Sequence, residues 1–125
     1  MKLTKIKLTK DASNRLRFLA GRTGLTPNLL CRLGFCLSLA EPAQPRVTEY
    51  REEEREFNRY TLLGEYDALF MAMLKQRCQA EGIPEDELPE YFRAHLNRGV
   101  TILQQRTKGL GDLIALMPRL DTAGR

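Results

Sequence analysis

Residues 24–39 constrain the fold most, because they combine a helix start signal with a densely apolar helix. Thr26 can cap a helix by accepting a hydrogen bond from a backbone N–H, and Pro27 suits the first helical position. Apolar side chains then cover most of the helix circumference and leave only a narrow stripe near Arg32 for water. Such a helix needs other elements around it. The sequence therefore predicts a mainly helical fold.

Residues 2–10 alternate with the period of two that is typical of a β-strand. One face of this strand is wet and basic, and it carries Lys5, Lys7 and Thr9. No second strand is apparent in the sequence. We therefore expect the strand to pair with its copy in a second subunit, which would make a dimer, to lie at an edge, or to remain a flexible arm.

A further helix is predicted for residues 12–21, with Thr9 or Asp11 as its N-cap. The order is then strand, helix, short glycine-containing turn, helix, which is the β-α-α arrangement of ribbon-helix-helix repressors. An ordinary helical hairpin with a basic arm has the same order. In the repressor arrangement the basic strand face contacts DNA, while Thr26 and the amide of Asn28 hold a phosphate at a helix N-terminus.

Charge is sorted along the chain although the formal net charge is only +4. Residues 1–36 hold eight Lys or Arg and one Asp, whereas residues 37–90 hold six bases and thirteen acids. A basic head favours a polyanionic partner, although a merely solvated basic face is the alternative. The basic side chains expected to contact DNA are Lys2, Lys5, Lys7, Lys10, Arg15, Arg17 and Arg22. Few aromatic residues lie among them, so binding to the duplex backbone is favoured over stacking on unpaired bases.

The rest of the chain also reads as mainly helical, and residues 1–125 are expected to form a single domain. Residues 62–80 show helical spacing, and Gly82 follows them as a stop signal. Residues 47–60 allow either a helix or an extended segment. Beyond Pro89 a helix is expected to point Arg93, Arg98 and Arg106 outward. Residues 108–112 are expected to form a turn before a short amphipathic helix.

No residue pattern indicates catalysis, a cofactor or a bound metal. The acidic run at 52–56 is more typical of a solvated face than of a metal site, and His95, the only histidine, is expected in the core. An odd number of cysteines, three, indicates reduced thiols and a cytoplasmic protein, with sulfur carriage by a cysteine disfavoured. No apolar run is long enough to span a membrane.

Two stretches carry a resemblance to a known family: residues 23–39, TGLTPNLLCRLGFCLSL, and residues 60–70, YTLLGEYDALF. They resemble the DndE family of bacterial DNA sulfur-modification (phosphorothioation) proteins. The resemblance implies a non-catalytic accessory subunit that binds duplex DNA, intact or nicked, scaffolds the sulfur-transfer proteins of the system, and assembles as a homo-oligomer, a dimer or a tetramer. The alternatives are a DNA nickase of the same system and a ribbon-helix-helix transcriptional repressor.

Overall fold

A long helix, α5, runs across the whole of the structure, a computed structural model that describes residues 3–107. The domain is mainly helical, as expected, and begins with the β-α-α order. Its elements in chain order are β1 (Lys5–Leu8), α1 (Lys10–Thr23), α2 (Pro27–Ala40), η1 (Val47–Tyr50), β2 (Arg55–Asn58), α3 (Arg59–Leu63), η2 (Gly64–Tyr66), α4 (Asp67–Ala80), η3 (Glu85–Glu87) and α5 (Leu88–Arg106).

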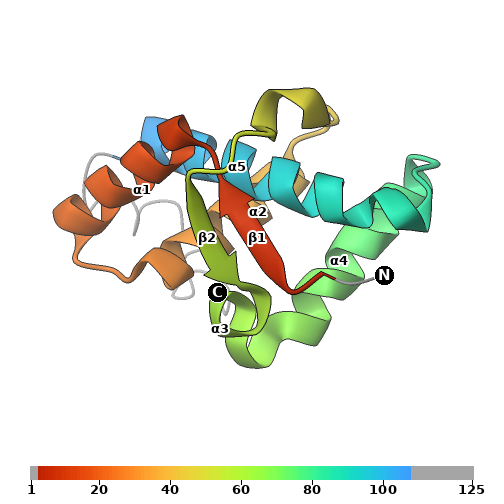
Figure 1. The fold of residues 1–125 in the computed structure, drawn as a ribbon, viewed down its shortest axis with the longest axis horizontal. Coiled ribbons are helices and arrows are strands. Elements are labelled where there is room, and N and C mark those ends of the chain that lie inside the picture. Colours follow the sequence, from red (N-terminus) through yellow and green to blue (C-terminus); the bar gives the residue numbers. More distant parts are fainter. Residues whose placement is uncertain (1–2, 108–125) are drawn as a thin grey trace, which may run out of the picture.

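Helices α2 and α5 cross in direct backbone contact at the centre of the fold (Figure 1). A Cβ atom added to Gly99 would lie 2.1 Å from the carbonyl oxygen of Gly34, so neither position tolerates a side chain. Beside this crossing the ring of Phe35 packs against Phe92 and Phe70, at centroid distances of 5.0 and 5.7 Å. The expected burial of the 24–39 helix is thus achieved mainly against α5, with α4 alongside.

The N-terminal strand has its partner within the same chain, and the expectation that no such partner exists is wrong. β1 pairs antiparallel with β2, with Ile6 opposite Phe57. The expected faces are confirmed for Ile6 and Leu8, which are buried, and for Lys5, which is exposed. The expectation for Thr9 is wrong, because this residue of the predicted wet face is buried where α1 begins. Residues 55–58 were hard to recognise as a strand because they read Arg-Glu-Phe-Asn, with only one apolar residue.

Helix α1 begins where its cap predicts. The Oγ1 atom of Thr9 accepts a hydrogen bond from the amide of Ala12, and the helix runs on to Thr23, two residues beyond the expected end. Gly24 then adopts φ 73°, a left-handed conformation that favours glycine and allows the chain to turn sharply. The Oγ1 atom of Thr26 caps α2 by accepting from the amide of Leu29 at 3.3 Å, as its position in the sequence indicates.

The segment 62–80 is not one helix. Helix α3 ends at Leu63, Gly64 adopts φ 56°, and the separate helix α4 begins at Asp67. The apolar spacing continues through this break, so periodicity alone does not reveal it. The region 47–60 resolves into a short 3₁₀ helix, η1, followed by β2. The turn and short helix expected beyond Lys108 lie outside the described residues, and none of the described helices is long and apolar enough to cross a membrane.

Candidate nucleic-acid interface

The two strand lysines expected to contact DNA are ion-paired with acids of their own chain. The Nζ atom of Lys7 lies 3.1 Å from a carboxylate oxygen of Glu53 and 3.9 Å from one of Glu56. Lys5 lies 3.6 Å from the other oxygen of Glu56. The pairing of β1 with β2 creates these contacts, because Lys7 is directly opposite Glu56 in the register. The acidic run, expected to be a solvated face, therefore places Glu53 and Glu56 against the lysines of the strand.

Thr9 and the outer edge of β1 are held by a buried residue of α5 that sequence reasoning missed. Asn97 accepts a hydrogen bond from the amide of Thr9 at 2.8 Å and donates one to the carbonyl oxygen of Lys7 at 3.1 Å. Its side-chain amide thus mimics a neighbouring strand. Thr9 is buried, and its hydroxyl caps α1, so both of its polar groups are engaged within the protein.

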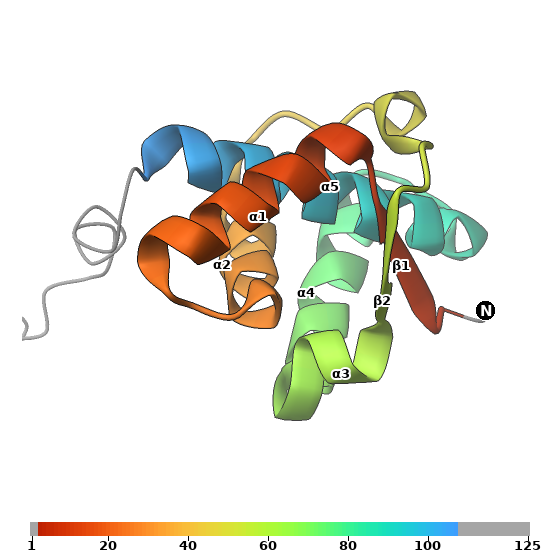
Figure 2. The ribbon, with the colours of Figure 1, turned by 60° about the vertical axis from the view of Figure 1, so that its left-hand side comes forward.

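Helix α1 presents a second basic surface, which we call the α1 face; it consists of Lys10, Asn14, Arg17, Phe18, Gly21 and Arg22. All six are exposed, because the opposite side of the helix packs into the core through Ala12, Leu16 and Leu19. In Figure 2, α1 lies at the outside of the molecule, in front of α5. Three of the predicted DNA contacts, Lys10, Arg17 and Arg22, thus lie on the exposed side of α1.

The α1 face has little acidic compensation. Asp11, the only acid in α1, has its Oδ2 atom 2.8 Å from the Nε atom of Arg15. Arg15 also donates to Gln104 at 2.6 Å and is half-buried, so it belongs to the packing between α1 and α5. Arg17 donates to the neutral side chain of Asn14 at 3.0 Å, and within residues 3–107 it pairs with no carboxylate.

The N-terminus of α2 follows the α1 face directly in the chain. Thr26 is exposed and Asn28 is half-buried at this helix start. Both predicted residues are therefore next to Arg22 at the end of α1, rather than on the β-strand pair. Lys2, the remaining predicted contact, lies outside the described residues.

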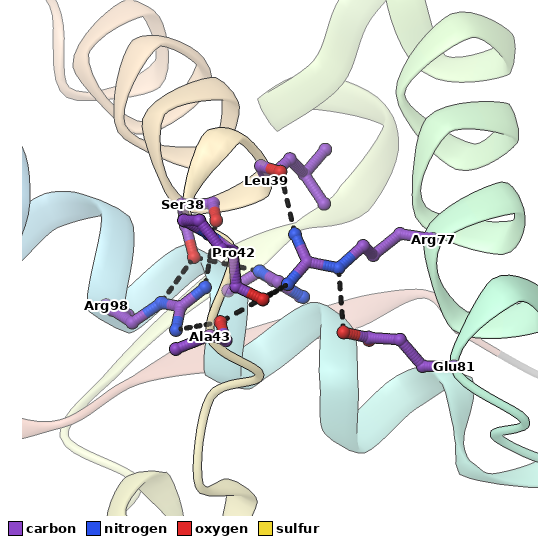
Figure 3. A network of polar contacts seen from close by, with 8 residues as sticks. Ser38, Leu39, Pro42, Ala43, Arg77, Glu81 and Arg98 are labelled. Atoms are coloured by element: carbon purple, nitrogen blue, oxygen red, sulfur yellow. Dashed lines mark hydrogen bonds and ion pairs between the residues drawn. The ribbon is translucent and has the colours of Figure 1, made fainter.

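The arginines of α5 do not extend the basic surface as expected. Arg98 turns inward at the end of α2, where it donates to the carbonyl oxygens of Ser38 at 2.8 Å and Ala43 at 2.7 Å (Figure 3). Arg93 donates to the carbonyl oxygens of Tyr50, the last residue of η1, and of Arg51, which follows it. Arg106 is exposed, and it forms an ion pair with Glu41 at 2.9 Å. Arg98 and Arg106 thus hold the end of α2 and the residues after it, and Arg93 holds the end of η1.

His95 is a core residue, as its apolar helical face indicates. It is fully buried, and its Nδ1 atom lies 2.8 Å from the Oγ atom of Ser38. Burial, and then the nearby positive charges of Arg98 and Arg77, lower the pKa of His95 to about 3. The imidazole is therefore neutral near pH 7 and has no route to an external substrate.

The three thiols occupy different environments. Burial raises the pKa of Cys31 to about 12, and burial together with the nearby charge of Glu81 raises the pKa of Cys78 to about 11. Cys78 lines a hollow of about 330 Å³ between α4 and the start of α5. Cys36 is exposed, unlike the buried thiol expected, and partial burial still raises its pKa. The protonated state favoured at each position lowers the reactivity of these cysteines.

The acidic run serves the protein's own backbone and lysines. A carboxylate oxygen of Glu52 accepts a hydrogen bond from the amide of Lys10 in the first turn of α1, where the helix dipole favours a negative charge. Within residues 3–107 no group of three His, Cys, Asp or Glu side chains is arranged to hold a metal ion.

Comparison with known proteins identifies relatives of this fold. A sequence model of the family described as "DNA sulphur modification protein DndE" matches residues 5–109. The crystal structure of DndE from Escherichia coli B7A, involved in DNA phosphorothioation modification, superposes with a TM-score of 0.67 at 24% sequence identity, covering 82% of this chain and 98% of that one. A mutant DndE involved in DNA phosphorothioation superposes with a TM-score of 0.62 at 20% identity, covering 82% and 97%. No curated protein sequence matches the chain.

Proposed function

Because the chain belongs to the DndE family of DNA sulphur modification proteins, we propose that it is a non-catalytic subunit that binds DNA for the phosphorothioation system. The observation that carries this proposal is the α1 face, where the exposed side chains of Lys10 and Arg17 lie on one side of the helix and pair with no carboxylate within residues 3–107. A surface of this kind attracts the phosphate backbone and releases its condensed counterions.

Three cations of the α1 face, Lys10, Arg17 and Arg22, are the proposed phosphate contacts. Thr26 and Asn28 extend the site, since the amides at the start of α2 add a positive dipole end next to Arg22. Lys5 and Lys7 contribute at its margin, but only as far as DNA displaces Glu53 and Glu56. Lys2, which lies outside the described residues, stays a proposed contact on its charge alone. If three to five phosphates are engaged, log K falls against log salt with a slope of about 3 to 4.5.

Part of the acidic middle of the chain lies away from the α1 face and disfavours DNA there. The segment 41–90 carries thirteen acids and six bases. Glu52 contacts the first turn of α1, but the helices α3 and α4 lie away from α1 in Figure 2. That side remains available for the proteins that perform sulfur transfer, or for further copies of the chain in a homo-oligomer. In this proposal the subunit holds DNA and its partners supply the chemistry.

The buried, neutral imidazole of His95 and the raised pKa values of the thiols support a role without catalysis. Incubation of supercoiled plasmid with the protein, with and without magnesium, tests this directly. We expect no nicked product over several hours. Nicking that depends on magnesium and on protein concentration would establish the nickase alternative.

Fluorescence anisotropy with an intact and a nicked duplex, at several salt concentrations, tests DNA binding. We expect binding that weakens steeply with salt, and the double variant Lys10→Gln, Arg17→Gln should lower the affinity. A matched control, Lys75→Gln with Arg46→Gln, removes the same charge from exposed positions outside the α1 face and should have a smaller effect. Absence of binding at low salt would contradict the proposal, and a preference of about a thousandfold for one sequence would indicate a repressor instead.

A further inference from the structure

Phe18 is an exposed aromatic residue in the middle of the α1 face. Its side chain is 46% exposed although phenylalanine has no polar group to satisfy in water. Its neighbours on the helix surface are Arg17 and Arg22, and the guanidinium carbon of Arg22 lies 5.5 Å from the centre of the Phe18 ring. The ring is thus presented among cations on the surface proposed to meet DNA.

Within the described residues, the surface next to Phe18 is open. Apart from the chain neighbours of Gly21 and the backbone of its own helix, no heavy atom of residues 3–107 lies within 4 Å of the position that a Cβ atom would take on Gly21, one helical turn beyond Phe18. Arg22 lies over the ring and Gly21 has no side chain, so residues 3–107 leave the remaining exposed part of the ring accessible to a flat group.

We propose that Phe18 is a stacking platform for an unpaired nucleobase, with Arg17 positioned for the adjoining phosphate. The inference rests on the proposed DNA-binding function and deepens it, because it names the form of DNA that gains affinity: a strand with an accessible base, as in single-stranded or gapped DNA. Bases inside an intact duplex are already stacked on each other and cannot reach the ring. Stacking of bases on aromatic side chains beside basic groups is the usual way in which proteins bind single strands.

The charge around Phe18 distinguishes it from the other exposed aromatic residues of the described chain. Tyr60 and Tyr66 are 54% and 48% exposed, but they lie within the segment that holds Glu56, Glu65 and Asp67. Carboxylates repel a phosphate backbone, so those tyrosines do not fit a nucleic-acid strand. The guanidinium carbon of Arg59 lies 4.9 Å from the centre of the Tyr60 ring, but Arg59 is ion-paired with Asp67 at 2.8 Å, so its charge is already compensated.

The test compares a single-stranded oligothymidine and an intact duplex of equal length, using wild type, Phe18→Leu and Phe18→Tyr. Leucine keeps an apolar side chain of similar size without an aromatic face, and tyrosine keeps the ring. We expect Phe18→Leu to bind the single strand about fivefold to a hundredfold more weakly, to bind the duplex within about twofold of wild type, and Phe18→Tyr to retain single-strand affinity. Circular dichroism confirms that each variant is folded.

Three results would overturn the stacking proposal while leaving duplex binding by the α1 face intact. The first is an unchanged affinity of Phe18→Leu for the single strand, and the second is an equal loss for both DNAs. The third is a fall in molecular mass on sedimentation that accompanies the loss of affinity, which would mean that a second copy of the chain covers Phe18. If wild type binds neither DNA, the proposed function fails as well.

Discussion

The β1 strand and helix α1 are consecutive in the sequence and both are basic, yet their cations meet different surroundings. Lys5 and Lys7 are paired with Glu56 and Glu53, which approach from β2 and the segment before it. The side-chain cations of Lys10 and Arg17, on the α1 face, pair with no carboxylate within residues 3–107, although Glu52 accepts a hydrogen bond from the backbone amide of Lys10. Formal charge per residue is higher in β1, with two lysines in four residues, than in α1, with four Lys or Arg and one Asp in fourteen, but the lysines of β1 are the ones that are ion-paired.

The difference shows that a basic segment of the sequence does not by itself indicate a ligand site, because acidic residues from elsewhere in the same chain can fold against it and pair with its cations. Exposed ion pairs of this kind contribute little to stability, about 0 to 1 kcal/mol each. They nevertheless lower the number of counterions that a bound polyanion can release. We therefore expect the β1 lysines to act mainly in the strand pair, and we propose the α1 face rather than β1 as the DNA site.

The largest expected effect concerns how β1 is held. Asn97→Ala removes the acceptor for the Thr9 amide and the donor to the Lys7 carbonyl, and leaves both buried backbone groups without a partner. We expect the free energy of unfolding to fall by about 2 to 4 kcal/mol in urea titrations. Asn14→Ala, on the exposed side of α1, serves as the control and should change it by less than about 0.5 kcal/mol.

DNA affinity of the folded Asn97→Ala protein should stay within about twofold of wild type, because the α1 face is unchanged. A loss of affinity as large as that of the α1-face variants would break the comparison. It would show that the strand region contributes directly to DNA binding.

Much of the framework follows from the sequence, and the long-range pairings do not. Thr9, Thr26 and Pro27 are local signals whose effect is decided within one helical turn, so α1 and α2 begin where predicted. The partner of β1 lies about fifty residues away in a strand with one apolar residue, which local patterning cannot identify.

The same limit applies to the site. Clustering of Lys10, Arg17 and Arg22 follows from helical spacing alone. By contrast, the pairing of Lys7 with Glu53, the inward turn of Arg98 and the role of Asn97 depend on tertiary contacts. Arg98, for example, donates a hydrogen bond to the carbonyl oxygen of Ser38 near the end of α2 (Figure 3). This contact forms only when α2 and α5 pack against each other, so the local sequence does not reveal it.

The second prediction concerns the α1 face itself. The double variant Lys10→Gln, Arg17→Gln removes two cations that have no carboxylate partner in the described chain, so we expect duplex affinity to fall roughly tenfold at moderate salt. Anisotropy titrations measure this, and urea titrations should show nearly unchanged stability. An affinity within twofold of wild type would remove the α1 face as the site.

The third prediction sharpens the role of the acids. Glu53→Gln with Glu56→Gln frees Lys5 and Lys7, so duplex affinity should rise about twofold to fivefold. Because any loss of negative charge favours DNA, the control is Glu85→Gln with Asp86→Asn, which removes the same charge from exposed positions in η3, just before α5. Equal gains in the two variants would mean that the acids act only through net charge.

The smallest effect is expected for Lys5→Gln with Lys7→Gln in the otherwise wild-type protein. These lysines are already neutralised by Glu53 and Glu56, so duplex affinity should fall by less than about threefold in anisotropy titrations. In the Glu53→Gln, Glu56→Gln background the same change should cost more. A large loss in the wild-type background would contradict the assignment of these lysines to packing.

The slope of log K against log salt, measured side by side for wild type and the two Lys/Arg double variants, tests the central claim most directly. Each engaged phosphate contributes about 0.9 to the slope, so Lys10→Gln, Arg17→Gln should lower its magnitude by about 1.8, and Lys5→Gln, Lys7→Gln by less than about 0.5. Both variants lose the same formal charge. Equal changes in slope, or the larger change for the β1 lysines, would contradict the account.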